Sequence, residues 1–176
     1  LTISNIGVED LHYELTGSAE DTVRILGLIY ASSASLLNQA ISALQQQFTK
    51  FSVTTFSSSS TSSLQAALNG IDVVLVPRFT SNASSVYSNF GPVLQSFVNQ
   101  GGVVIFCGIY ESSYSQSMYS TNLLSGSYAS YITSGTVNLT NLSDPLVQGL
   151  PTGISASQYV FYHTFTNPDL VVLGTY

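Results

Sequence analysis

The residues of this 176-residue chain best suited to covalent chemistry are one cysteine and one histidine, far apart in the sequence. Cys107 directly follows an apolar stretch, and His163 lies in an aromatic stretch near the C-terminus. A thiol with a histidine brought close by the fold is the minimal arrangement for nucleophilic acyl chemistry. Each residue also has a plainer interpretation, as a small buried side chain for Cys107 and a half-buried aromatic neighbour for His163, and we favour that one.

The charge composition excludes several classes of function. Charged residues make up 7% of the chain, and three basic against nine acidic residues give a net charge of −6, which is unsuited to binding nucleic acid or anionic lipid. No apolar run approaches the roughly 20 residues that span a bilayer, so we predict no membrane insertion. A single cysteine excludes an intramolecular disulfide, and the cysteine and histidine count excludes a zinc site built from them. We therefore predict no metal and no cofactor.

Neutral polar residues take the place of the missing charges, because the chain contains 30 Ser and 16 Thr. This replacement favours an extracellular or cell-surface protein, or one covered by assembly. Three Asn-X-Ser/Thr triplets, beginning at Asn82, Asn138 and Asn141, are candidate glycosylation sites and agree with a secreted glycoprotein. Because the chain begins at Leu1 without a signal peptide, we expect it to be processed or cut from a longer protein.

The N-terminal 21 residues differ from the rest and are predicted to be a separate strand segment or linker. They hold five of the nine acidic residues, and residues 1–6 and 11–15 alternate apolar with polar side chains, as strands do. The sequence of these residues resembles the closing strands of immunoglobulin-like repeats of secreted bacterial and archaeal proteins. The segment is either the tail of such a domain, a strand offered to a neighbour, or an edge strand of the same domain.

Residues 22–176 are predicted to form one α/β domain, because buried strands alternate with amphipathic helices, which implies a mainly parallel sheet between helix layers. We expect the first helix to present one apolar stripe that ends at Phe48, and the helix over 84–99 to break at Gly91 and Pro92. Residues 107–135 are rich in Tyr and Ser and show no regular pattern. The predicted strands are residues 23–30, 51–56, 71–76 and 103–106, with later ones at 137–139, 159–162 and 170–173; the predicted helices are the one carrying Leu37 to Phe48, 64–68 and 84–99.

Four stretches carry a family resemblance: IDVVLVP, GGVVIFCG, DPLVQGLP and FYHTFTNPDLVVLGTY. Over residues 23–176 the chain resembles the class I glutamine amidotransferase-like superfamily, including its trehalose-utilisation-like branch. The resemblance implies a flavodoxin-like three-layer sandwich, with Cys107 as the nucleophile in a strained elbow and His163 as its partner.

The chain departs from the catalytic pattern of that superfamily in three places. Ile105 and Ile109 stand where catalytic members have small residues around the cysteine, and a turn that begins with Pro77 replaces the glycine-rich oxyanion turn. No acidic residue follows Asp169. We therefore predict a degenerate member without catalysis.

The predicted function is that of an extracellular structural or adhesive module of a surface or filament-forming protein. Its predicted partners are copies of itself or neighbouring domains of a longer chain, met through the N-terminal strand and the Tyr/Ser-rich stretch, and glycans. Two alternatives stay open: an amidotransferase-like or hydrolase enzyme that uses Cys107 and His163, and a carbohydrate-binding module.

Overall fold

A computed structural model describes residues 22–46, 48–107, 112–132, 134–144, 150–156, 160–166 and 174–175. The chain divides into two compact units, Leu1–Leu123 and Leu124–Tyr176, which are taken separately below. The predicted N-terminal strand segment, residues 1–21, lies outside the described residues. Within the described ranges, no helix is both long and apolar enough to cross a membrane.

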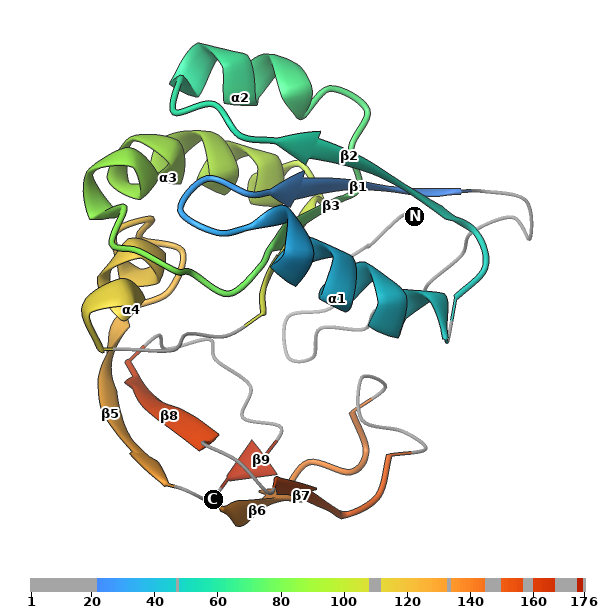
Figure 1. Cartoon of the computed structure of the whole chain (residues 1–176), viewed down its shortest axis with the longest axis vertical. Coiled ribbons are helices and arrows are strands. Elements are labelled where there is room, and N and C mark those ends of the chain that lie inside the picture. Colours follow the sequence, from blue (N-terminus) through green and yellow to red (C-terminus); the bar gives the residue numbers. More distant parts are fainter. Residues whose placement is uncertain are drawn as a thin grey trace, which may run out of the picture. The chain divides into compact units, whose positions relative to one another are not determined.

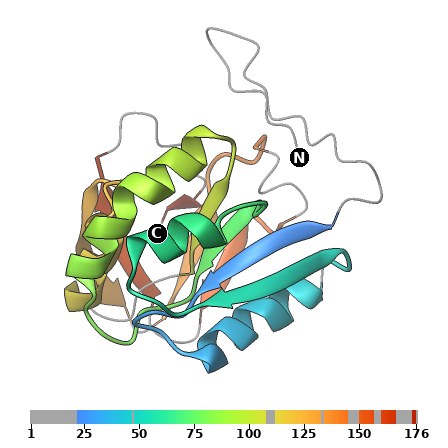
Figure 2. The ribbon, with the colours of Figure 1, turned by 90° about the horizontal axis from the view of Figure 1, so that it is seen from above.

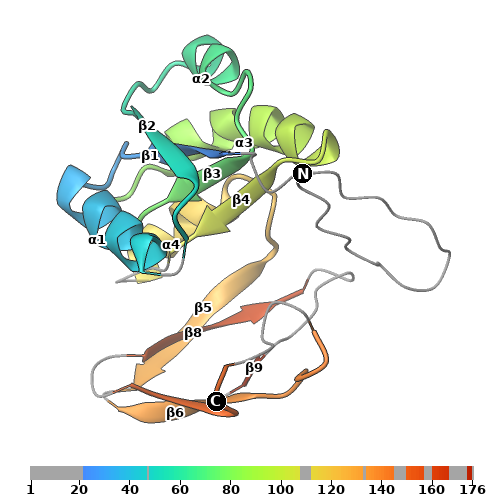
Figure 3. The same cartoon turned by 90° about the vertical axis from the view of Figure 1, so that its right-hand side faces the viewer.

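The first unit is an α/β flavodoxin-like fold, as predicted. Among its described residues, four strands form one parallel sheet in the order β2-β1-β3-β4. Helix α1 covers one face of this sheet, and α2 and α3 cover the other, which makes three layers (Figures 2 and 3). The elements, traced in Figure 1, are β1 (Val23–Leu28), α1 (Ala34–Gln45), β2 (Phe51–Phe56), α2 (Thr61–Ala67), β3 (Val73–Val76), α3 (Ser84–Asn99), β4 (Val103–Phe106) and α4 (Ser112–Tyr119).

Buried side chains alternate between the two faces of the sheet, as the strand pleat requires. Ile25 and Leu75 lie on the α1 face and pack with Leu37 of that helix. Their neighbours Leu26 and Val74 are buried on the opposite face. The continuous apolar runs of β1 and β3 are therefore explained by burial on both sides.

Serine side chains begin the first two helices. Ser33 accepts a hydrogen bond from the Leu36 N–H at the start of α1, and Ser60 accepts one from Ser63 at the start of α2. These bonds satisfy backbone donors that have no partner within the helix.

Two details of the predicted helices were wrong. Helix α1 ends at Gln45, so Phe48 is not part of its stripe and is 61% exposed in the loop before β2. Helix α3 runs without interruption through Pro92. Pro92 is on the exposed side of α3, where water can replace the hydrogen bond that proline cannot donate.

Helix α4 was not predicted, because it has no apolar stripe and buries Ser115 and Ser117 instead. The Ser117 hydroxyl accepts a hydrogen bond of 2.8 Å from the backbone N–H of Ala83, directly before α3. The N-cap residue of α3 is Ala83, whose side chain cannot accept a hydrogen bond, and α4 supplies a polar contact at this residue.

The second unit consists of antiparallel strands. β5 (Gly126–Ile132) pairs with β8 (Val160–Phe165), and β6 (Gly135–Leu139) pairs with both β7 (Gly153–Ala156) and β9 (Gly174–Thr175). The strands predicted at 137–139 and 159–162 correspond to β6 and β8, whereas β5 and β7 were not predicted. The strand predicted at 170–173 lies outside the described residues.

Candidate functional site

In a doubly wound sheet, ligands bind beyond the carboxyl ends of the strands, where the strand order reverses. Here the order reverses between β1 and β3, because the chain leaves β1 into α1 on one face and β3 into α3 on the other. The residues to examine are the loop after β1, the loop after β3, and Cys107 after β4.

Hydrogen bonds join the two loops at this reversal point directly to each other. The Thr80 N–H donates to the Ala31 carbonyl at 2.8 Å, and the Ser32 hydroxyl donates to the Arg78 carbonyl at 2.8 Å. Ala31 has a φ of 59°, a left-handed conformation that costs energy for a residue with a β-carbon. The bond from Thr80 helps to hold this conformation, so the loops bind each other where a ligand would bind in related folds.

Aromatic side chains fill the space behind these loops. Phe79 and Tyr87 are about 1% and 0% exposed, and their rings meet edge to face with centroids 4.9 Å apart. Tyr87 also contacts Phe90, at 5.5 Å between centroids, and its hydroxyl donates to the Tyr30 carbonyl at 3.3 Å. Burial raises the pKa of the Tyr87 hydroxyl well above its usual value, so this hydroxyl stays neutral. The space at the strand reversal point is therefore occupied by buried aromatic side chains.

Cys107 lies where the sequence placed it, immediately after β4. Its backbone N–H donates to the Val76 carbonyl at 2.9 Å, and the residue is exposed. Neighbouring atoms still remove part of the water around the sulfur, and this desolvation raises the pKa of the Cys107 thiol. Catalytic cysteines have lowered pKa values, because the thiolate is the nucleophile. The surroundings of Cys107 therefore disfavour the thiolate form that a nucleophilic cysteine needs.

His163 lies on β8 of the second unit, opposite Tyr128 of β5 in the antiparallel register. Cys107 belongs to the first unit, so neither unit by itself contains the predicted Cys107 and His163 pair. The roles predicted for the two residues stay predictions.

The turn after β3 offers little to stabilise an oxyanion. Pro77 has no N–H, and the N–H of Thr80 is already bonded to Ala31. Among the residues that the structure describes, no three His, Cys, Asp or Glu side chains lie close enough to hold a metal ion.

The three predicted glycosylation asparagines lie in different settings. Asn82 is exposed, and its side-chain oxygen accepts hydrogen bonds from the N–H and hydroxyl of Ser84. Asn138 is exposed on β6, whereas Asn141 is half-buried and accepts a hydrogen bond of 2.9 Å from Ser143.

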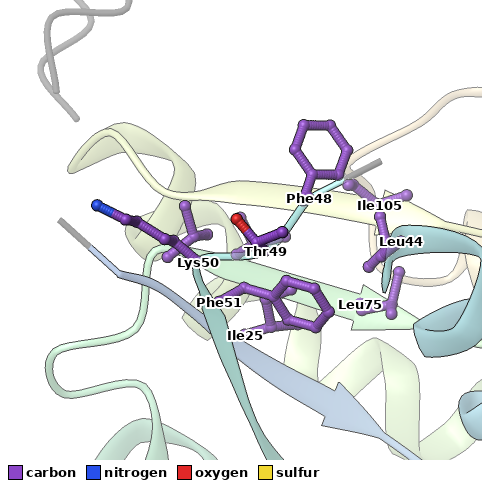
Figure 4. Close-up of a pocket in the computed structure, with 10 residues that line it drawn as sticks. Ile25, Leu44, Phe48, Thr49, Lys50, Phe51, Leu75 and Ile105 are labelled. Atoms are coloured by element: carbon purple, nitrogen blue, oxygen red, sulfur yellow. The ribbon is translucent and has the colours of Figure 1, made fainter. Parts of the chain in front are cut away.

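The sequence did not predict an apolar groove on the α1 face of the sheet, with a volume of about 470 Å³ (Figure 4). Its floor is formed by Ile25 of β1, Leu75 of β3 and Ile105 of β4, and its wall by Leu44 and Phe51. Among the described residues that line the groove, Lys50 at the rim is the one with a charged side chain. Each wall residue lies in a predicted element, but the groove depends on which part of the face α1 leaves uncovered.

The fold and the site thus define an α/β protein of flavodoxin-like architecture whose usual ligand position is filled by its own side chains. Comparisons with family models, curated proteins and solved structures found no match to this chain.

Proposed function

We propose that this chain is an extracellular, non-catalytic structural or adhesive module of a surface or filament-forming protein. It associates with copies of itself or with neighbouring domains, through the N-terminal strand and the Tyr/Ser-rich stretch of residues 107–135. Glycans on Asn82, Asn138 or Asn141 cover part of its surface.

The observation that carries this proposal is the outer edge of β4. Among the described residues, no strand pairs with this edge, because β4 is the last strand in the order β2-β1-β3-β4. The strand reads Val-Val-Ile-Phe, and Ile105 is 43% exposed. Soluble proteins usually protect such an edge with charged residues or proline, and β4 has neither. An unprotected apolar edge is a template for a strand of another chain.

The neutral helix surfaces also support association. No acidic residue lies in the first turn and no basic residue in the last turn of α1, α2 or α3. Exposed neutral side chains at the end of α3 bond to each other: the Gln95 amide donates to Asn99 at 3.1 Å, and the amide of Gln100, which directly follows the helix, donates to Ser96 at 3.0 Å. Without like charges to repel each other, copies of this surface can approach closely.

Association can be tested by blocking the edge without breaking the sheet. The Val103 N–H donates to the carbonyl of Asp72, directly before β3, at 3.1 Å, and the Cys107 N–H donates to Val76 of β3 at 2.9 Å. The N–H groups of Val104 and Phe106 therefore point to the outer edge. Val104→Pro removes one outward donor and no bond within the sheet. We expect sedimentation velocity to show concentration-dependent oligomers for the native chain and monomers for Val104→Pro.

Two controls make this experiment decisive. Circular dichroism verifies that Val104→Pro is folded. Hydrogen exchange of the native chain provides a measurement without any variant, because the amides of Val104 and Phe106 should exchange more slowly at high protein concentration. A native chain that stays monomeric throughout, with equal exchange at low and high concentration, would contradict the proposal.

An enzyme that uses Cys107 is the second candidate, because the thiol is exposed at the carboxyl end of β4. It requires a reactive thiol whose rate depends on His163. The alkylation experiment described in the Discussion distinguishes it from the structural module.

A further inference from the structure

The turn between α2 and β3 contains the single Asn-Gly pair of the chain, Asn69 followed by Gly70. Asparagine is a thermolabile residue, because the backbone nitrogen of the next residue can attack its side-chain amide carbon. Glycine in that next position leaves the nitrogen unhindered, since it has no β-carbon. The pair therefore has the chemistry for a modification that needs no enzyme.

The structure leaves both reacting groups available. Asn69 and Gly70 are exposed at the C-terminal end of α2. The N–H groups on either side are engaged, because that of Asn69 donates to Ala66 at 3.3 Å. That of Ile71 donates to Leu68 at 3.1 Å. Within the described part of the chain, neither the Gly70 N–H nor the Asn69 side chain has a hydrogen-bond partner.

A hollow beside the turn gives the reaction room. It has a volume of about 260 Å³ and is lined by the turn itself, by Asp72 and by the end of α3. This space is large enough for the Asn69 side chain to rotate toward the Gly70 nitrogen and for water to enter. Attack at this nitrogen therefore requires no opening of the packed core.

We propose that Asn69 is a modification site that converts to aspartate and isoaspartate in the folded chain. The Gly70 nitrogen forms a bond to Cγ of Asn69, and its proton leaves with the side-chain nitrogen as ammonia. The product is a cyclic succinimide, which a water molecule then opens. Attack of water on Cγ gives aspartate, whereas attack on the backbone carbonyl carbon gives isoaspartate, in which the main chain runs through Cγ.

The conversion acts on the contact between β1 and β3. Asp72, shortly after the turn, accepts side-chain hydrogen bonds of 3.1 and 3.0 Å from Arg24. The Arg24 guanidinium also lies beside Gly70, because a β-carbon on Gly70 would be 3.0 Å from Nη1. Isoaspartate adds a carbon to the main chain here and places a new carboxylate near this guanidinium, where it competes with Asp72. A negative charge at the C-terminal end of α2 is also unfavourable for the helix dipole. The modification therefore loosens the Arg24 and Asp72 pair, and it does not depend on where the protein acts or what it binds.

Ageing of the purified full chain tests the modification. The chain is incubated at mildly alkaline pH, peptide mapping by mass spectrometry measures the amide-to-acid conversion at each asparagine, and an isoaspartate methyltransferase labels the isoaspartate. Asn99 is the internal reference, because it is exposed at the end of α3 but is followed by Gln100. We expect Asn69 to convert at least about tenfold faster than Asn99. Asn69→Gln is the matched control and should stop conversion at this position, since its longer side chain does not readily form the ring.

A synthetic peptide with the sequence of residues 66–73 shows what the fold does to the rate. We expect the folded chain to convert Asn69 within about tenfold of the peptide rate. Slower conversion than this would mean that the turn protects Asn69, and conversion no faster than at Asn99 would mean that Gly70 does not promote the reaction. Either result would overturn the proposal.

The effect on the contact between β1 and β3 is measured separately. The aged native chain should melt at a lower temperature than the fresh chain, whereas ageing should not change the melting temperature of Asn69→Gln. Arg24→Gln should lower the melting temperature of the fresh chain more than that of the aged chain, because ageing has already loosened the pair. An aged chain that contains isoaspartate and melts like the fresh one would contradict the loosening of this pair.

Discussion

The Arg24 guanidinium donates two hydrogen bonds to the Asp72 carboxylate, from Nε to Oδ2 at 3.1 Å and from Nη2 to Oδ1 at 3.0 Å. The backbone N–H of Arg24 donates to the same carboxylate at 2.8 Å. These contacts tie the amino end of β1 to the residue that precedes β3. The hydrogen bonds from the Arg24 side chain are the main reason that the pKa of Asp72 lies below its ordinary value of 3.8.

The first prediction concerns the pH dependence of this ion pair. A carboxyl whose pKa is lower in the folded state stabilises the fold above its unfolded-state pKa, and that contribution is lost as the pH falls through the folded-state pKa. Asp72→Asn should therefore lower the melting temperature slightly at pH 7, and the difference should shrink as the pH falls below the ordinary pKa of 3.8 and through the lowered folded-state pKa, because Asp72 then takes up a proton and loses its charge. Arg24→Gln should behave in the same way. A difference that stays constant from pH 7 to pH 2 would show that the pair is not its cause.

The second prediction concerns the reactivity of Cys107. Because desolvation raises the pKa of its thiol, iodoacetamide should modify Cys107 more slowly at pH 7 than it modifies an unstructured cysteine peptide, and the rate should rise as the pH is increased. His163→Ala should leave the rate unchanged. Fast modification at pH 7 that His163→Ala suppresses would favour the enzyme and contradict the structural module. Mass spectrometry of the intact chain measures both rates.

The third prediction concerns a close approach between α3 and the turn after α4. A β-carbon on Gly91 would collide with the backbone carbonyl oxygen of Thr121, which cannot rotate away as a side chain can. In an exposed helix interior, replacing glycine by alanine stabilises by about 1 kcal/mol. Here we expect Gly91→Ala to destabilise by about 1–3 kcal/mol, as overpacking does. Urea unfolding measures the change, with Asn89→Ala at an exposed position of α3 as the control; a stabilised Gly91→Ala chain would refute the close approach.

The fourth prediction concerns the packing of α1 on β1. A β-carbon on Gly27 would lie 2.5 Å from Cδ2 of Leu37, so Gly27→Ala must displace that side chain. We expect a cost of about 1–3 kcal/mol. In a Leu37→Ala background the same change should cost clearly less, with a coupling energy of about 0.5–3 kcal/mol. Additive effects in this double-mutant cycle would show that Gly27 does not limit how closely α1 packs.

The fifth prediction tests whether the strand reversal point is structural. Phe79→Ala should destabilise by about 3–5 kcal/mol, because it removes a buried ring from the cluster with Tyr87. Tyr87→Phe should cost only about 0.5–1.5 kcal/mol, since it removes one hydrogen bond and keeps the ring. Val98→Ala, at an exposed position, serves as the control. A loss below about 1 kcal/mol for Phe79→Ala would indicate that the cluster tolerates an opening there.

The sequence predicts best the strands and helices whose buried side chains form a regular apolar pattern. The bounds of β2 and β4 match the predicted ones, because each is an apolar or β-branched run between turn residues. Helix α4 was not predicted because its buried face contains serines whose hydrogen-bond partners are distant in sequence. The hydrogen bond from the Ala83 N–H to the Ser117 hydroxyl is an example. Hydrophobic periodicity cannot detect a helix that packs through polar contacts.

The candidate site divides in the same way. The position of Cys107 at a strand end was predictable, because it follows directly from the apolar run of β4. The closed reversal point was not, since it depends on Phe79 turning inward and on the bond from Thr80 to Ala31. The groove was also unpredictable, because it results from the extent of α1 over the face and from no single residue pattern.

The neutral side-chain bridges of α3 have a consequence for the environments in which this fold can work. Gln95 with Asn99, and Gln100 with Ser96, hold positions where many helices carry salt bridges. Dissolved ions screen attraction between opposite charges, but they leave hydrogen bonds between uncharged groups largely intact. These groups also do not titrate between acidic and alkaline conditions. These side-chain hydrogen bonds on α3 should therefore persist at high as well as at low salt concentration.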